Sequence, residues 1–247
     1  MSYVRSGALA AWAQAWLVGR LSLDEVLDAT TGDDAPHQVV GLAGFDEPVT
    51  LREALVAWRR TGAAPRLVLP APGDVRGLPG PAPLRAAALD AGEAVVAPGL
   101  ALVPEVTVHT PSSAPPTVVW TAFVAEALPH DHLDLREAQY DLTTTIRESA
   151  SALATAGVGG SSADVATLLS GARRAGDQVN VPPDHPSSAV ALLSQAERLQ
   201  AVLDLVAEDP VGGAVHQHGM AVRAEALRPL ATAVRRARQA AYNALPA

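Results

Sequence analysis

The spacing of apolar residues changes near residue 130, from a period of about two to a period of about 3.6. Before that point, runs rich in β-branched residues are separated by Pro-Gly, Pro-Ser and Pro-Pro turns. After it, long amphipathic stretches follow one another with few such turns. Because strands repeat every two residues and helices about every 3.6, the sequence predicts an α+β fold. We expect a mixed α/β domain over residues 1–129 and a helical domain over residues 130–247.

The front part predicts about five short strands placed among helices. Two capping boxes mark helix starts, one from Ser22 to Glu25 and one from Thr50 to Glu53. In such a box the hydroxyl and the Glu three residues later each accept a hydrogen bond from the other residue's free backbone N–H. The expected strands are 37–42, 66–69, 93–97, 100–109 and 117–124, and the expected helices are 4–17, 23–28, 51–60 and 83–91.

The back part predicts four helices, at 134–156, 162–174, 187–208 and 214–245. In the last of them, apolar residues recur by alternating steps of three and four, as in the seam of a bundle or coiled coil. The seam consists of Leu227, Leu230, Val234, Ala237 and Ala241. Because the connection at 210–213 is short, the third and fourth helices should lie antiparallel. We expect a four-helix bundle, complete by itself or completed by a second copy of the chain.

Charge and cysteine content exclude several classes of function. The formal net charge is −8, and all 18 basic residues are Arg. Neither half is basic, so nucleic acids and anionic membranes are not expected as partners. The absence of Cys excludes disulfides, thiolate catalysis and Cys-ligated zinc. The last helix alone carries a basic cluster, which either pairs within the chain or meets an anionic partner. The cluster consists of Arg223, Arg228, Arg235, Arg236 and Arg238.

The apolar stretch over residues 7–18 resembles the core of a signal peptide only in part. Gln14 interrupts it, and no small-residue cleavage site follows. At about 12 residues it is also too short to cross a bilayer. We therefore expect a core helix here and a soluble cytoplasmic protein.

The first candidate site is the Pro- and Gly-rich segment 72–81, placed between a strand and a helix. Open α/β sheets bind ligands at such loops, where glycines admit a ligand to the backbone and Arg76 can hold an anion. The sequence therefore predicts a site for a small anionic ligand. The residues concerned are Asp74, Arg76, Gly77 and Gly80. The alternative is a rigid connector in which Asp74 and Arg76 pair with each other or with neighbours.

The second candidate site is the run His130-Asp131-His132-Leu133-Asp134. It resembles part of the metal-binding signature of metallo-β-lactamase-fold hydrolases. That resemblance implies that His130 and His132 bind one metal and Asp134 another, although Leu135 stands where the family has a further His. The alternative is a polar linker in which Asp131 or Asp134 caps the following helix.

The third candidate site is the Gly- and Ser-rich segment 156–164. It resembles the phosphate loop of GHMP small-molecule kinases, which implies nucleotide contacts at Gly159, Gly160, Ser161 and Ser162. The alternative is a turn in which Ser161 or Ser162 caps a helix. The chain contains no G-x-S-x-G, Walker, dinucleotide-binding or H-E-x-x-H motif, and no particular cofactor is indicated.

These patterns favour a non-enzymatic interaction or regulatory protein that self-associates through its C-terminal helices. The expected partners are a second copy of the chain and other proteins. Two alternatives stay open at this stage: a metal-dependent hydrolase using His130, His132 and Asp134, and a protein that binds a small anionic ligand or nucleotide at segment 74–80.

Overall fold

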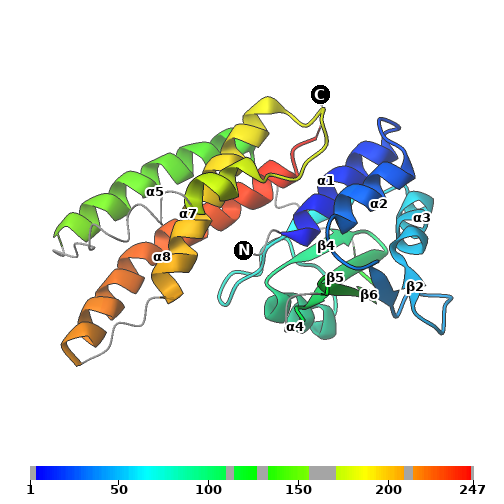
Figure 1. Cartoon of the computed structure of the whole chain (residues 1–247), viewed down its shortest axis with the longest axis horizontal. Coiled ribbons are helices and arrows are strands. Elements are labelled where there is room, and N and C mark those ends of the chain that lie inside the picture. Colours follow the sequence, from blue (N-terminus) through cyan, green and yellow to red (C-terminus); the bar gives the residue numbers. More distant parts are fainter. Residues whose placement is uncertain (1–3, 110–113, 127–132, 156–170, 209–213, 246–247) are drawn as a thin grey trace. The chain divides into compact units, whose positions relative to one another are not determined.

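The structure is a computed structural model whose chain divides into two compact units (Figure 1). The N-terminal unit comprises Ser2–Asp131 together with Asn180–Asp184 and the last three residues. The helical unit comprises His132–Val179 and His185–Ala244, with Met1. A mixed sheet with helices in the first unit and helices in the second confirm the expected α+β fold. The structure describes residues 4–109, 114–126, 133–155, 171–208 and 214–245.

A six-stranded mixed sheet forms the centre of the N-terminal unit, in the order β2-β1-β6-β5-β4-β3. Only β1 and β6 pair in parallel; every other neighbouring pair is antiparallel. The sequence did not predict β2, because two residues are too short to show a period of two. The strands are β1 (Gln38–Val40), β2 (Val49–Thr50), β3 (Arg66–Val68), β4 (Ala94–Ala97), β5 (Leu100–Thr107) and β6 (Thr117–Phe123).

Helices cover both faces of this sheet. They are α1 (Arg5–Leu17), α2 (Leu23–Thr31), α3 (Leu51–Thr61) and α4 (Ala82–Ala91). Leu84 and Ala88 of α4 pack with Val68, Val96 and Val103 on one face. On the other side, α1 lies against β3, β4 and β5 (Figure 1). The strands therefore carry apolar side chains on both faces, as in sheets buried between helices.

The helix α1 is more buried than the expected amphipathic pattern predicts. Of its residues, only Trp12 and Leu17 keep intermediate exposure, and the rest are buried. Its many Ala residues allow close approach of neighbours on every side. A helix buried around its circumference must satisfy its own polar groups inside the protein, and this requirement determines the site described below.

One of the two expected capping boxes is confirmed and the other is wrong. Ser22 accepts the N–H of Glu25 at 3.2 Å, and the Glu25 carboxylate accepts the N–H of Ser22 at 2.7 Å. At Thr50 the hydroxyl donates to the Glu53 carboxylate and makes no bond to the helix backbone. The hydroxyl thus contacts the Glu53 carboxylate in place of the Glu53 N–H, so the reciprocal pattern of a capping box is not formed.

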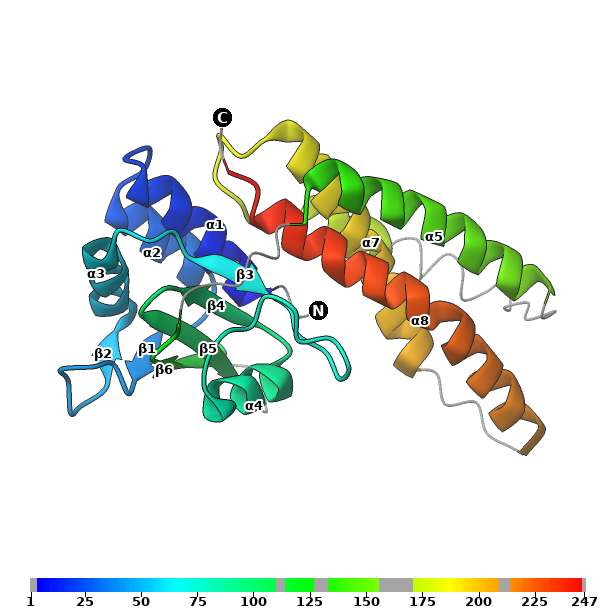
Figure 2. The ribbon, with the colours of Figure 1, turned by 180° about the vertical axis from the view of Figure 1, so that it is seen from behind.

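The helical unit contains α5 (Leu135–Thr155), α7 (Ser187–Glu208), α8 (Ala214–Tyr242) and a helical stretch at 171–177. The helix α8 packs against both α5 and α7 (Figure 2). Four members of the predicted seam, Leu230, Val234, Ala237 and Ala241, are buried within the chain. No helix in the described residues is long and apolar enough to cross a membrane.

Gly176 provides a test of the packing in this unit. A Cβ added to it would lie 2.9 Å from the backbone oxygen of Ser194 in α7 and still closer to the Arg198 side chain. Gly→Ala in a helix ordinarily stabilises by about 1 kcal/mol. Here we expect Gly176→Ala to lower the free energy of unfolding in urea by about 1–3 kcal/mol, because the added methyl overpacks the contact.

A double variant separates the two contacts of Gly176. Gly176→Ala/Arg198→Ala keeps the collision with the backbone, so it should be less stable than Arg198→Ala alone. If these two variants are equally stable, the helical stretch at 171–177 and α7 can move apart without a loss of free energy, and the expected overpacking is wrong.

Candidate functional site

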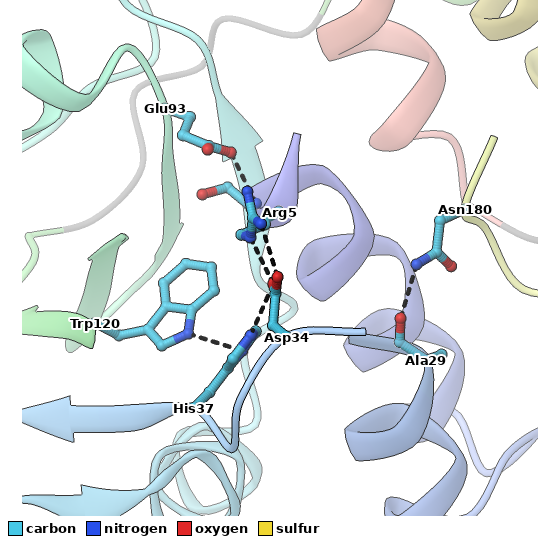
Figure 3. Close-up of polar contacts among 8 residues, drawn as sticks. Arg5, Ala29, Asp34, His37, Glu93, Trp120 and Asn180 are labelled. Atoms are coloured by element: carbon cyan, nitrogen blue, oxygen red, sulfur yellow. Dashed lines mark hydrogen bonds and ion pairs between the residues drawn. The ribbon is translucent and has the colours of Figure 1, made fainter. Parts of the chain in front are cut away.

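A chain of buried polar side chains begins at the first turn of α1 (Figure 3). Nε and Nη2 of Arg5 donate to the two carboxylate oxygens of Asp34, at 2.6 and 2.8 Å. Their side chains are only 9% and 5% exposed. This is the two-pronged geometry in which a guanidinium holds a carboxylate most strongly.

His37 continues the chain from Asp34 to the sheet. Its Nε2 lies 3.3 Å from Oδ2 of Asp34, and the indole N–H of Trp120 points at its Nδ1 at 3.2 Å. Because an indole N–H can only donate, Nδ1 must be the unprotonated nitrogen, and Nε2 carries the proton that Asp34 accepts. Trp120 stands beside His37 because β6 pairs with β1 in parallel and places Trp120 opposite Val39.

Burial and charge determine the protonation of this chain. Burial is the main cause that lowers the pKa of His37, and Arg5 adds to it, while Asp34 opposes the shift. Burial by itself would raise the pKa of Asp34, but the hydrogen bonds and charges of Arg5 and His37 outweigh it, so the pKa is lowered. At neutral pH, Arg5 and Asp34 therefore form an ion pair, and Asp34 is also hydrogen-bonded to the neutral imidazole of His37.

This arrangement resembles the Asp–His pair of hydrolases but lacks what a general base needs. In such enzymes one imidazole nitrogen faces the carboxylate and the other faces the reacting group. In this protein the other nitrogen accepts the Trp120 indole, and the His37 side chain is 0% exposed. A group that cannot reach a substrate cannot take its proton, so the arrangement serves to hold α1, β1 and β6 together.

Glu93 satisfies a second polar group at the start of α1. The residue before this helix is Val4, which offers no capping side chain. The Glu93 carboxylate accepts the free N–H of Ser6 at 2.8 Å, in place of a local cap. A carboxylate at this end of a helix also interacts favourably with the helix dipole. Two acids, Asp34 and Glu93, thus meet the first turn of α1.

A segment distant in sequence binds to α1 and α2 within the same unit. We call Asn180–Asp184 the strap. The side-chain oxygen of Asn180 accepts the indole N–H of Trp12 at 2.8 Å. Its NH₂ donates to the carbonyl of Ala29 at 2.7 Å (Figure 3). Arg20 pairs with Asp184 at 2.7 Å. No sequence pattern predicted a contact for this segment, although its Pro182-Pro183 pair between two helices is typical of an extended stretch.

The predicted anion-binding loop is an ordered connector between β3 and α4. Ala71 and Asp74 exchange backbone hydrogen bonds at 2.9 and 2.8 Å around Pro72-Gly73, where Gly73 takes the positive φ that such a turn needs. Nε and Nη2 of Arg76 donate to both oxygens of Asp74, at 2.8 and 2.7 Å. Gly77 and Gly80 also have positive φ. The guanidinium predicted to hold a ligand is thus bound by a carboxylate of its own loop.

The position of this loop in the sheet differs from that of known ligand loops. Ligands bind at the carboxyl ends of parallel strands, where the strand order reverses. The strand before the loop, β3, is the last of the sheet and is antiparallel to its single neighbour β4. The sheet position that favoured a ligand at 72–81 is therefore absent here, and the ligand site itself stays a prediction.

The predicted metal-binding run lies largely outside the described residues. His130 and His132 fall there, as does the Gly- and Ser-rich segment 156–164. Asp134 is described: its carboxylate accepts the N–H of Arg136 at 2.6 Å, and its carbonyl accepts the N–H of Ala138 at 2.9 Å. Both bonds are those of a residue that caps the start of α5. In the described part of the chain, no three His, Asp or Glu side chains are grouped closely enough to hold a metal ion.

Described members of the basic cluster of α8 pair with acids of the same unit. Arg238 donates to Glu197 of α7 at 2.9 Å, and Arg236 lies 3.7 Å from Asp141 of α5. Arg228 pairs with Glu225, three residues earlier in the same helix, at 2.7 Å. For these three arginines the structure supports pairing within the chain.

Comparisons with known proteins match both parts of the chain. Residues 6–135 match the family model described as Rv1486c-like protein, N-terminal domain, and residues 136–239 match Rv1486c-like protein, C-terminal domain. The chain is 35% identical to protein Rv1486c of Mycobacterium tuberculosis (strain ATCC 25618 / H37Rv) over an alignment of 282 positions, gaps included, which covers 97% of this chain and 96% of that protein. It is 29% identical to protein ML1804 of Mycobacterium leprae (strain TN), with the same coverage. Both relatives are named as uncharacterised proteins. No solved structure matches the chain.

The pKa shifts of Asp34 and His37 predict that the folded protein loses stability in acid. The unfolded chain binds a proton at His37 near pH 6.5, whereas the buried imidazole binds one only at lower pH. The contribution of His37 is therefore present above pH 6.5 and is lost as the pH falls below it. Asp34 acts in the same direction, with its contribution lost as the pH falls below 3.8.

We expect the free energy of unfolding in urea to fall between about pH 7.5 and pH 5. The fall should be smaller in His37→Gln, which keeps a polar side chain but cannot titrate. The difference between the two proteins isolates His37 from the other His residues. Equal falls in both would mean that His37 does not titrate differently in the folded protein.

Proposed function

This chain belongs to the Rv1486c-like family, and we propose that it is a non-enzymatic interaction protein that acts by binding another polypeptide, a second copy of the chain included. The observation that carries the proposal is the recognition of the strap. An extended segment is held by an indole N–H, a main-chain carbonyl and a guanidinium, each directed at a particular group. These are the contacts by which protein surfaces select polypeptide segments.

The state of the polar side chains supports a role without catalysis. Asp34 is held by Arg5, both ring nitrogens of His37 are engaged, and Arg76 is held by Asp74. Catalytic groups instead have a free functional atom that faces a substrate. Among the described residues, these were the arrangements closest to a catalytic or anion-binding set.

Self-association remains the first form of interaction to test. The C-terminal seam was the reason to expect it, and four of its five residues, Leu230, Val234, Ala237 and Ala241, are buried in a helix that packs against α5 and α7 of the same unit. A second copy would therefore have to replace one of those helices or use a different surface. For this reason we base the proposal on the N-terminal unit. Association through α8 would first have to displace α5 or α7, which already pack against it.

Native mass spectrometry combined with light scattering tests the proposal. From about 5 to 500 µM protein, purified without a His-tag, we expect a species of two chains that grows with concentration. We also expect less than about 0.1 metal ion per chain after growth with zinc or manganese, since a bound metal needs three or four converging ligands. A strict monomer that carries one metal per chain would contradict the proposal and favour the hydrolase that His130, His132 and Asp134 suggest.

Thermal unfolding with phosphorylated ligands tests the loop at 74–80. A ligand at about 100 times its dissociation constant adds roughly 2.7 kcal/mol of stability. Because Asp74 already occupies Arg76, we expect nucleotides and sugar phosphates at millimolar concentration to leave Tm unchanged. A saturable rise in Tm that Arg76→Ala abolishes, and that the exposed-surface variant Arg85→Ala retains, would make this loop a ligand site.

A further inference from the structure

The strap binds the N-terminal unit as a peptide ligand would. Its side-chain amide accepts from Trp12 and donates to Ala29 at the same time, so both ends of Asn180 are used. Ala29 lies in the last turn of α2, where carbonyls lack a partner within the helix. The amide satisfies one of these carbonyls while it accepts from Trp12, which gives the surface a specific preference for Asn at this point of the segment.

The rest of the strap is held more weakly. Pro182 is buried, but Pro183 and Asp184 are exposed. The ion pair between Arg20 and Asp184 has side-chain exposures of 39% and 34%. Ion pairs as exposed as this contribute little to stability, since water solvates both partners and salt screens them. The strap is therefore bound specifically but with a small total binding free energy, as segments that detach and rebind are.

The path of the chain permits the strap to leave without unfolding either unit. The strap is joined on both sides to residues of the helical unit, 179 before it and 185 after it. Apart from Met1, which groups with the helical unit, and residues 245–247, which group with the N-terminal unit, the chain outside the strap passes between the units at residues 131–132. If the strap detaches, this one connection still joins the helical unit to the N-terminal unit. The strap of one copy can then bind the N-terminal unit of another copy. All of its contacts are formed again there, between two chains.

We propose that the α1–α2 surface that holds the strap within one chain also accepts the strap of a second copy, so that two chains pair by exchanging straps. The proposal rests on the proposed function and identifies its partner. The occupant is a second copy because the surface fits this segment: an amide, two prolines and a carboxylate four residues after the amide. Exchange needs no new interface, which makes it an economical route to a dimer.

Competition within the chain determines when exchange occurs. A strap attached to its own chain has an effective concentration on the order of millimolar. The wild-type protein is therefore mainly monomeric at low micromolar concentration, and paired chains accumulate as the concentration approaches millimolar. Any change that weakens the hold within the chain, while leaving a second copy able to bind, favours the pair.

A pair of complementary variants tests the exchange in the full-length protein. One variant, Trp12→Phe/Arg20→Ala, has an intact strap and a damaged surface. The other, Asn180→Ala/Asp184→Ala, has a damaged strap and an intact surface. We expect each alone to be monomeric at about 20 µM and an equal mixture to form a one-to-one complex by light scattering. A mixture that stays monomeric up to about 200 µM would overturn the proposal.

A matched control uses an exposed ion pair in the same unit, away from the strap. Arg52 and Asp24 pair at 2.6 Å between α3 and α2. Mixing Arg52→Ala with Asp24→Ala should give no complex, and a complex in this mixture would also overturn the proposal. Circular dichroism establishes that every variant is folded. If a double variant does not fold, the single changes Trp12→Phe and Asn180→Ala replace the double ones, with the same two outcomes.

Wild-type association separates this proposal from the broader one. If the wild-type protein associates but the complementary mixture does not, strap exchange is wrong and the protein still acts by binding a polypeptide. If neither associates and a synthetic peptide of residues 178–186 fails to bind the Asn180→Ala/Asp184→Ala variant, the surface does not bind segments in trans and both proposals fail.

Discussion

The N-terminal unit depends on how the polar start of a buried helix is satisfied. The first turn of α1 carries Arg5, whose charge is neutralised by Asp34, and a free N–H at Ser6, which Glu93 accepts. Removing one partner of a buried ion pair typically costs about 3–5 kcal/mol, because the other charge stays buried alone. The Ala-rich helix can therefore be buried over most of its length because two acids from distant parts of the sequence meet its first turn.

The same constraint explains why these residues are poor candidates for catalysis. One ring nitrogen of His37 contacts Asp34 and the other accepts the Trp120 indole N–H. Neither ring nitrogen is therefore left to act on a substrate. The strap extends this pattern to the surface, where Asn180 completes the end of α2 and Asp184 meets Arg20. Inside the unit the polar contacts hold elements together, and at its edge the same kinds of contact hold a segment that can exchange.

Sequence reasoning predicted the features that depend on local spacing. The box from Ser22 to Glu25 spans three residues, and the structure contains it. The same spacing from Thr50 to Glu53 gave a wrong prediction, because the Thr50 hydroxyl bonds to the Glu53 carboxylate and not to the helix backbone. Asp34 and His37 could have been noted as a pair in one turn. The contact of His37 with Trp120, 83 residues away in sequence, depends on the pairing of β1 with β6, and the contact of Asp34 with Arg5, 29 residues away, depends on where α1 packs.

The candidate sites show a similar division. Asp74 and Arg76 are close in sequence, and the pairing that was one of the two readings of this loop is the one observed. The capping role of Asp134 was likewise one of two readings, and its bond to Arg136 has that geometry. Asn180 gave no local signal, because its partners Trp12 and Ala29 lie more than 150 residues earlier.

Nitrogen-15 NMR of the His37 side chain tests most directly that the buried chain is structural. We predict a neutral ring with the proton on Nε2 and an unprotonated Nδ1 that accepts the Trp120 indole, unchanged from about pH 8 to pH 6. We also predict slow exchange of the Nε2 proton with solvent, because the ring is fully buried. Rapid exchange of the proton would show that the ring is open to solvent, and a proton on Nδ1 would rule out the bond from Trp120. Either result would contradict the account.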